Sequence, residues 1–302
     1  MLESLLAQSR KEFEIILVED GSTVTCEEVV QEFEKKLPIR YYSKSNSGPG
    51  PTRNFGFAHA HGAYFVVFDS DCIIPSTYFE AVDQVLKTTP LDAWGGPDKG
   101  HESFTLPQRA MAYTMSSFLT TGGIRGGKKR IGWFQPRSFN MGISKKVFED
   151  TGGFKFDRFA EDIEFSIRMK KAGFRVGLIP DAFVYHKRRS SFLQFFKQVF
   201  NFGKGRALIG QVHPEEVKIT HWFPALFTLA TITLPFLWFA GDLLFAITLG
   251  LFSLYLFLIF FHSLLMNRNF SVAGLSVISA ILQLWGYGAG FLVESVKQRV
   301  KT

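Results

Sequence analysis

Residues 64–75 read YFVVFDSDCIIP, and this stretch decides how the chain is interpreted. The apolar run 64–68 predicts a buried β-strand. The run stops at Asp69 and Asp71, two carboxylates separated by one serine. One interpretation is a plain turn, because Asp favours turns and Pro75 lies close behind. The other is a metal site, because carboxylate oxygens suit Mg²⁺ or Mn²⁺.

Strands and helices alternate around this stretch. Strands are expected at 13–18 and 39–45, and helices at 25–36, within 48–60, and from Pro75 to about residue 87. This β-α-β-α-β-α order predicts an α/β domain with a mostly parallel, Rossmann-like sheet. Sheets of this kind bind ligands outside the carboxyl ends of their strands.

Polar residues gather at that edge of the predicted sheet. Glu19-Asp20 ends one strand, Asp69 and Asp71 end another, and Arg53-Asn54 lies where a glycine- and proline-rich loop enters a helix. This convergence favours the metal site over the plain turn. Cys26 and Cys72 form neither a disulfide framework nor a metal cluster by their spacing, and no chemistry is assigned to them.

The last part of the chain is apolar. Three runs without charge, 222–240, 243–261 and 271–293, each have about the ~20 residues that a transmembrane helix needs. Residues 221–302 hold only four of the 34 Lys and Arg and two of the 27 Asp and Glu. We therefore expect a transmembrane region of about three helices over 221–302, with three buried core helices as the alternative. Since nothing resembling a signal peptide precedes the charged part, we expect that part on the cytoplasmic face of the cell (inner) membrane.

A basic segment joins the two parts. Between Asp181 and Glu215 there is no acidic residue, yet there are six basic ones: Lys187, Arg188, Arg189, Lys197, Lys204 and Arg206. Apolar residues recur there at helical spacing: Phe192, Phe195, Phe196, Val199 and Phe200. Residues 187–220 therefore predict an amphipathic interfacial segment lying on an anionic leaflet. Nucleic-acid binding fits the charge but not the adjoining apolar runs.

Three stretches together resemble family-2 glycosyltransferases of the GT-A fold. They are EIILVEDGST (14–23), GPGPTRNFGFAHAHGAYFVVFDSDC (48–72) and GGFKFDRFAEDIEFSIRMKKAGFRVGLIPDAFVYH (152–186). The match runs in order from Leu2 to about Arg206. The resemblance implies a GT-A catalytic domain over 1–186 that transfers a sugar from a UDP-sugar or another nucleotide-diphosphate sugar, with inversion.

The resemblance also implies roles for individual residues. The nucleotide-binding positions are Asp20, Arg53, Asn54 and Asp69, and the ligands for Mg²⁺ or Mn²⁺ are Asp71, Asp69 and His186. Asp162 matches the general base. Glu161, Trp133 and Arg206 are expected on the acceptor or diphosphate side. The alternatives are turn, capping and structural roles, and Glu161-Asp162 also suits the positive end of a helix dipole.

The sequence as a whole predicts a membrane-anchored inverting glycosyltransferase that acts on a lipid-linked or cell-surface polysaccharide acceptor. Two alternatives stay open: a polyprenyl-phosphate sugar transferase, and a catalytically silent, membrane-bound subunit that binds nucleotide sugars as a scaffold. The Q-x-x-R-W signature of cellulose-like synthases is absent, which argues against a processive polymerase. Members of the family begin with a further strand and a Pro-containing turn. We therefore expect coding sequence for such a strand upstream of Met1.

Overall fold

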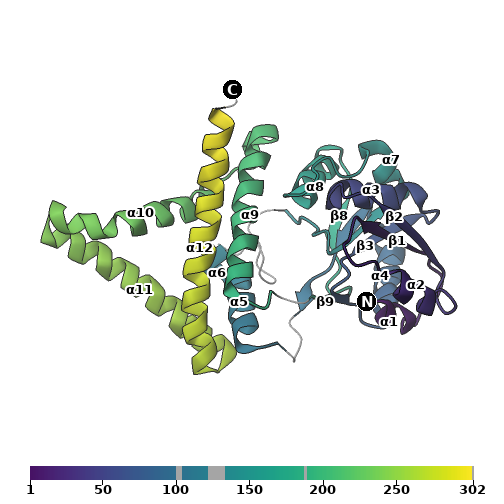
Figure 1. The fold of residues 1–302 in the computed structure, drawn as a ribbon, viewed down its shortest axis with the longest axis horizontal. Coiled ribbons are helices and arrows are strands. Elements are labelled where there is room, and N and C mark those ends of the chain that lie inside the picture. The colour runs from purple at the N-terminus through teal and green to yellow at the C-terminus, as the bar shows by residue number, and fades with distance from the viewer. Residues whose placement is uncertain (100–103, 122–132, 187–188, 301–302) are drawn as a thin grey trace. The chain divides into compact units, whose positions relative to one another are not determined.

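The computed structural model covers the whole chain and describes residues 1–99, 104–121, 133–186 and 189–300 (Figure 1). The chain divides into two compact units. The first contains Met1–His101 and Phe134–Lys187, and the second contains Glu102–Trp133 and Arg188–Thr302. The segment 104–121 thus belongs to the second unit, whereas the sequence analysis included it in a domain of residues 1–186.

The first unit alternates strands and helices. Its elements are α1 Leu2–Leu6, β1 Ile15–Asp20, α2 Glu27–Phe33, β2 Ile39–Lys44, α3 Pro49–His59, β3 Tyr64–Phe68, β4 Cys72–Ile73, α4 Tyr78–Thr88, β5 Ala93–Gly95, β6 Asp98–Lys99, β7 Asn140–Ser144, α7 Lys145–Thr151, α8 Glu161–Lys171, β8 Val176–Leu178 and β9 Val184–His186. The predicted alternation up to α4 is confirmed, and β3 has the predicted bounds.

The strands of this unit form three sheets: β1-β2, β3-β7-β5-β8 and β4-β9-β6. Strand β1 runs parallel to β2, β5 to β8, and β6 to β9. Strand β7 runs antiparallel to β3 and β5, and β9 runs antiparallel to β4. The described sheets are therefore mixed rather than mostly parallel. Only strands joined by a helical crossover tend to run parallel, and the chain reaches β7 after a long excursion into the second unit.

The apolar stretch VGLIPDAFVYH at 176–186 does not form a single strand. The stretch 176–186 forms β8 and β9, which belong to different sheets. Pro180 lies between them and cannot donate a hydrogen bond to a sheet. The amide of Ala182 instead bonds to the carbonyl of Ile179 in a turn. The turn carries His186 away from β8 and onto the sheet that contains β4.

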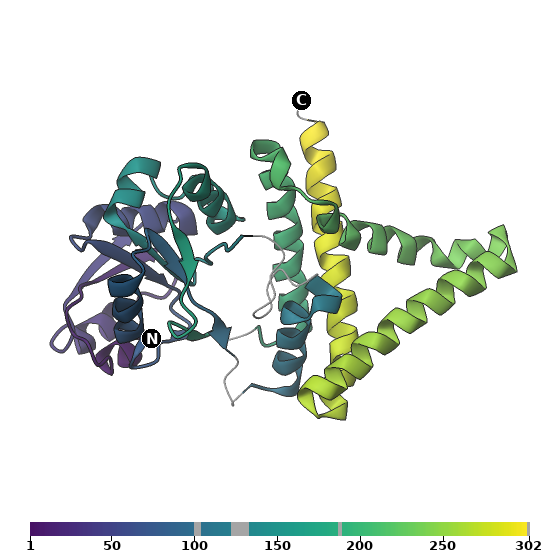
Figure 2. The ribbon, with the colours of Figure 1, turned by 180° about the vertical axis from the view of Figure 1, so that it is seen from behind.

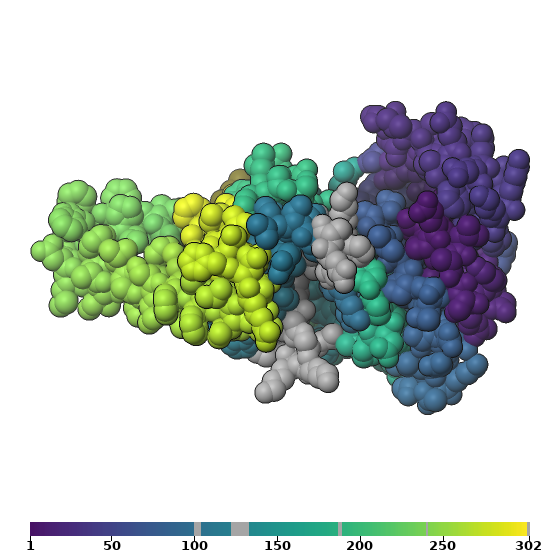
Figure 3. Space-filling model, turned by 90° about the horizontal axis from the view of Figure 1, so that it is seen from below, coloured from purple at the N-terminus to yellow at the C-terminus, as the bar shows by residue number. Residues whose placement is uncertain are grey.

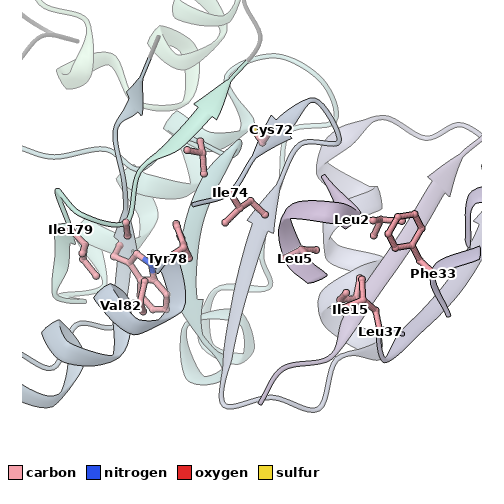
Figure 4. Packing of buried hydrophobic residues seen from close by; sticks show 13 residues of the cluster. Leu2, Leu5, Ile15, Phe33, Leu37, Cys72, Ile74, Tyr78, Val82 and Ile179 are labelled. Carbon is pink, nitrogen blue, oxygen red and sulfur yellow. The ribbon is translucent and has the colours of Figure 1, made fainter. Parts of the chain in front are cut away.

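The core of the first unit packs around α4 and the strands next to it. Figure 4 shows Leu2, Leu5 and Ile15 on one side of this cluster, and Tyr78 and Val82 on the other. The hydroxyl of Tyr78 donates a 2.6 Å hydrogen bond to Oδ1 of Asn140, and both side chains are fully buried. A buried polar pair of this kind is stable only because its hydrogen-bonding groups have partners. It fixes α4 against β7.

The second unit is helical. Its elements are α5 Leu106–Ser116, α6 Phe118–Thr121, α9 Phe192–Val212, the 3₁₀ turns η1 Pro214–Glu216, η2 Ile219–His221 and η3 Trp238–Ala240, α10 Phe223–Leu237, α11 Asp242–Asn267 and α12 Phe270–Arg299. Within the described part of the chain, three spans are long and apolar enough to cross a membrane: Ile219–Leu237, Asp242–Asn267 and Phe270–Arg299. Figure 2 shows α10 and α11 meeting at their far ends, while α9 runs along α12. Many apolar side chains of α10 and α11 are exposed, and Figure 3 shows part of this surface in green.

Helix α9 is the predicted amphipathic helix, but α5 and α12 pack against its apolar face. Phe195 and Val199 are buried. Helices α9 and α12 approach closely at glycines. A Cβ atom on Gly203 would lie 2.0 Å from the carbonyl oxygen of Tyr287, and one on Gly290 would lie 2.0 Å from that of Phe200. Small residues allow this close packing between apolar helices. That residues 187–220 form an interfacial segment stays a prediction. Lys187 and Arg188 lie outside the described residues.

Candidate active site

A cavity of about 1270 Å³ lies in the first unit between β1 and β3. Among the described strands, β1 pairs only with β2 and β3 only with β7, so the other edge of each strand borders this cavity. At the carboxyl ends of the strands the cavity is lined by Asp20, Arg53, Asp69 and Asp71. The structure thus brings together four of the residues that the sequence analysis selected.

Asp20 ends β1 and holds the loop that leads into α3. Its carboxylate accepts 2.9 Å hydrogen bonds from the backbone amides of Ser47 and Gly48 and forms an ion pair with Lys44. Burial raises the pKa of Asp20, but the bonds from Lys44, Ser47 and other donors outweigh it and hold the pKa well below its usual range. Gly48 is required in this loop, because its φ is +95° and a Cβ would lie 2.7 Å from the carbonyl oxygen of Asp157.

Arg53 connects two parts of the site. Its Nη2 lies 3.0 Å from Oδ1 of Asp69, at the end of β3, and its Nη1 lies 2.8 Å from Oε1 of Glu161, at the start of α8. The guanidinium also lies over the ring of Phe154, with 5.5 Å to the ring centroid. The planar fork of arginine suits contact with two carboxylates at once. Arg53 therefore fixes the end of β3 relative to α8.

Asn54 has a structural contact beside the site. Its Nδ2 donates to the carbonyl oxygen of Phe154, and its Oδ1 accepts from the amide of the same residue, both at 2.8 Å. Gly153 must be a glycine here, because its φ is +71° and a Cβ would lie 2.2 Å from the Asn54 oxygen. Asn54 thus positions the loop before α8. Its contact with a nucleotide stays a prediction.

Asp71 and His186 meet beside the end of β3. The Nε2 atom of His186 lies 3.2 Å from Oδ1 of Asp71, and the ring stacks on Phe139. The pairing of β4 with β9 produces this contact, because Cys72 lies opposite His186 in the register. Ligand atoms of Asp71, Cys72 and His186 all lie within 4.8 Å of one another. A carboxylate and an imidazole fit a divalent cation such as Mn²⁺, and the thiol of Cys72 is a neighbour that sequence analysis did not include.

Glu161 opens α8 and is buried. Its Oε1 accepts from Arg53 at 2.8 Å and from the hydroxyl of Ser138 at 3.4 Å. Burial, followed by the charge of Asp162, raises the pKa of Glu161, and the charge of Arg53 opposes this shift. The Glu161 carboxylate is therefore already bonded to other side chains of the protein.

Asp162 is the more accessible acid of the pair, with 16% of its side chain exposed. Its Oδ1 accepts a 2.8 Å hydrogen bond from the amide of Ile163, and its Oδ2 lies 3.6 Å from Nη1 of Arg137. Sequence analysis did not select Arg137, which lies just before β7. A carboxylate held in this way can accept a proton from a hydroxyl group.

Two of the predicted site residues belong to the second unit. Trp133 is half-buried, and Arg206 is buried in α9. Their expected roles on the acceptor or diphosphate side stay predictions.

Comparison with known families identifies the chain. The model described as Glycosyl transferase family 2 matches residues 1–152, and the model described as Glycosyl transferase family group 2 matches residues 138–289. The chain belongs to glycosyl transferase family 2. This confirms the family that the resemblance in the sequence implies.

Solved glycosyltransferase structures share the fold. The mannosyltransferase PcManGT from Pyrobaculum calidifontis, in complex with GDP-Man and Mn²⁺, aligns with a TM-score of 0.62 over 94% of this chain and 82% of its own, at 16% identity. S. aureus TarS 1-349, in complex with UDP-GlcNAc, aligns with a TM-score of 0.50 over 70% of this chain and 60% of its own, at 21% identity. The predicted GT-A fold is confirmed.

Curated relatives are glycosyltransferases as well. A Rickettsia felis protein, named an uncharacterized glycosyltransferase, is 43% identical over 70 residues, which are 23% of this chain and 12% of that protein. The uncharacterized glycosyltransferase EpsJ of Bacillus subtilis is 25% identical over 200 residues, which are 63% of this chain and 57% of EpsJ. The matched region therefore spans about half of EpsJ and a much smaller part of the Rickettsia protein.

Proposed function

We propose that the chain is a glycosyltransferase that is anchored in a membrane, takes its sugar from a nucleotide-diphosphate donor, and transfers it with inversion to a lipid-linked or cell-surface polysaccharide acceptor. One observation carries the proposal. Arg53 bridges Asp69 to Glu161. It thereby holds the carboxylates after β3 close to the start of α8, where Asp162 follows Glu161.

The donor belongs in the cavity between β1 and β3. Asp20 lines it as a charged carboxylate and can accept hydrogen bonds from a base or a ribose. The fold neighbours bind UDP-GlcNAc and GDP-Man, which supports a nucleotide sugar as the donor. A UDP-sugar is our first choice among the donors to test.

A divalent cation, Mg²⁺ or Mn²⁺, would be held by Asp71 and His186, with Asp69 as a third ligand. The cation would neutralise the charge that develops on the leaving diphosphate. Asp69 is already bonded to Arg53, so Asp71 and His186 are the principal ligands. The complex of PcManGT with Mn²⁺ supports this assignment.

Asp162 is the proposed general base. In an inverting transfer, an acceptor hydroxyl oxygen bonds to the anomeric carbon from the face opposite the diphosphate. The bond from that carbon to the phosphate oxygen breaks at the same time. The hydroxyl proton must move to a base, and Asp162 is less buried than Glu161, whose oxygen is already bonded to Arg53 and Ser138. Arg137 then serves to position Asp162.

The three long apolar spans support a membrane anchor, and we place the first unit on the cytoplasmic face of the inner membrane. The test of the whole proposal is a screen of radiolabelled nucleotide sugars with the detergent-solubilised full chain and a membrane lipid extract. We expect one donor to give a labelled lipid or polysaccharide product. Donor binding without any turnover would instead favour the silent scaffold.

A further inference from the structure

Arg206 is a buried cation for which the described part of the chain supplies no counter-ion. It lies in α9 with only 7% of its surface exposed. It forms neither a hydrogen bond nor an ion pair with any residue that the structure describes, and its charge acts on His221. His221 is buried too, and its Nδ1 accepts a hydrogen bond from the amide of Lys218.

A buried charge of this kind is expensive. An ionised side chain that loses hydration destabilises the fold unless an opposite charge or hydrogen bonds replace its hydration. The guanidinium is not sealed off completely, since none of its nitrogens is a fully buried atom without a partner. The charged residues nearby do not neutralise the charge of Arg206. Lys218 adds positive charge beside His221. Glu294 lies 4.0 Å from Lys204 and accepts from Gln298, and Glu215 lies 4.0 Å from His213. The arrangement suits an anionic ligand.

The position of this cluster in the unit indicates the source of the anion. The turns η1 and η2 connect polar residues at 214–218 to the apolar helix α10. Lys218 is exposed, and so is its neighbour Ile219, at 87%. Trp222 and Phe223 follow with large exposed fractions. Aromatic and basic residues at the end of an apolar span are typical of the level of lipid headgroups.

We propose that Arg206, with Lys218 and His221, binds the phosphate group of a membrane lipid. The guanidinium supplies paired donors to two phosphate oxygens, and Lys218 adds a second charge at the exposed side. His221 is near enough to feel both charges, and its Nδ1 bonds to the amide of Lys218. Binding of the phosphate does not require sugar transfer, so this proposal can fail while the proposed enzymatic function holds, and the reverse is also true.

The experiment uses the full chain in detergent and three short-chain or soluble probes. They are dioctanoyl phosphatidic acid, dioctanoylglycerol, which has no phosphate, and inorganic phosphate. Affinities are measured by native mass spectrometry and by the shift in apparent Tm that a bound ligand produces. We expect phosphatidic acid to bind and to raise the apparent Tm. Equal binding of dioctanoylglycerol, or equally tight binding of inorganic phosphate, would overturn the proposal.

Variants test the role of Arg206 directly. Arg206→Gln should weaken phosphatidic acid binding by roughly 10-fold or more, the scale of lost hydrogen bonds to a charged group. Arg206→Lys should retain part of the affinity. Lys87→Gln, which removes a positive charge from an exposed position in the first unit, should bind like the wild type. Wild-type affinity in Arg206→Gln would contradict the proposal. If that variant does not fold, the proposal is tested by the affinity of Arg206→Lys and by the Tm shift that phosphatidic acid produces in the wild type.

Discussion

The guanidinium of Arg53 donates a 2.8 Å hydrogen bond to Glu161, which lies 108 residues further along the chain. This contact joins α3, beside the cavity, to α8, which carries Asp162. Arg53 reaches Asp69 at the same time. A single side chain thus sets the position of the carboxylates after β3 relative to the proposed base.

Arg53→Gln should destabilise the protein. It would leave Glu161 buried without its cation, and breaking a buried pair costs about 3–5 kcal/mol. We expect the free energy of unfolding to fall by roughly 2–3 kcal/mol, because Asp69 is 38% exposed and solvent screens its interaction with Arg53. The apparent Tm of the full chain in detergent measures the effect. Arg10→Gln is the matched control, since Arg10 contacts two carboxylates at an exposed site. Equal Tm values for both variants would show that the bridge does not stabilise the fold.

Asp71→Ala should abolish turnover and weaken the binding of Mg²⁺ or Mn²⁺, because it removes the carboxylate that faces His186. Calorimetric titration with Mn²⁺ reads out metal binding without any need for activity. Asp150→Asn, at an exposed position on α7, serves as the control. Full wild-type activity in excess EDTA would contradict the metal assignment.

Asp20 should make the stability depend on pH in the acidic range. Its pKa is lower in the folded chain than in the unfolded chain, where Asp titrates near ~3.9. The contribution of the Asp20 carboxylate to stability is therefore complete above the unfolded pKa. It is lost as the pH falls through the lower pKa of the folded chain. We expect the apparent Tm of the wild type to fall more steeply below pH ~4 than that of Asp20→Asn. Parallel pH profiles for the two proteins would show that the bonds from Lys44, Ser47 and Gly48 do not favour the charged form.

The sequence predicts those parts of the fold that depend on local pattern. The apolar run before Asp69 is a strand with the expected bounds, since five apolar residues between polar ends leave little choice. The two strands at 176–186 could have been separated, because Pro180 is a visible interruption. The antiparallel pairing of β7 with β3 could not have been predicted, since it depends on how distant segments pair.

The same distinction holds for the site. The prediction of Asp69 and Asp71 rests on their place after a strand, and that of Asp162 rests on its motif. The partners of these acids come from far along the chain or from other elements. Arg137 lies beside Asp162 and Lys44 beside Asp20, and no spacing in the sequence predicts either contact. The covering of α9 by α12 is likewise a matter of packing, although the glycines at 286 and 290 are its visible signal.

The most direct test of the proposed mechanism is the rate of nucleotide release from the identified donor, with lipid extract as acceptor, in the wild type and in Asp162→Asn. The substitution is nearly isosteric and removes the proposed base. Donor affinity should therefore persist while the rate falls by roughly 10²–10⁴-fold, the usual scale of acid–base catalysis. Asp150→Asn should turn over like the wild type. A wild-type rate in Asp162→Asn, at unchanged donor affinity, would contradict the assignment of the base.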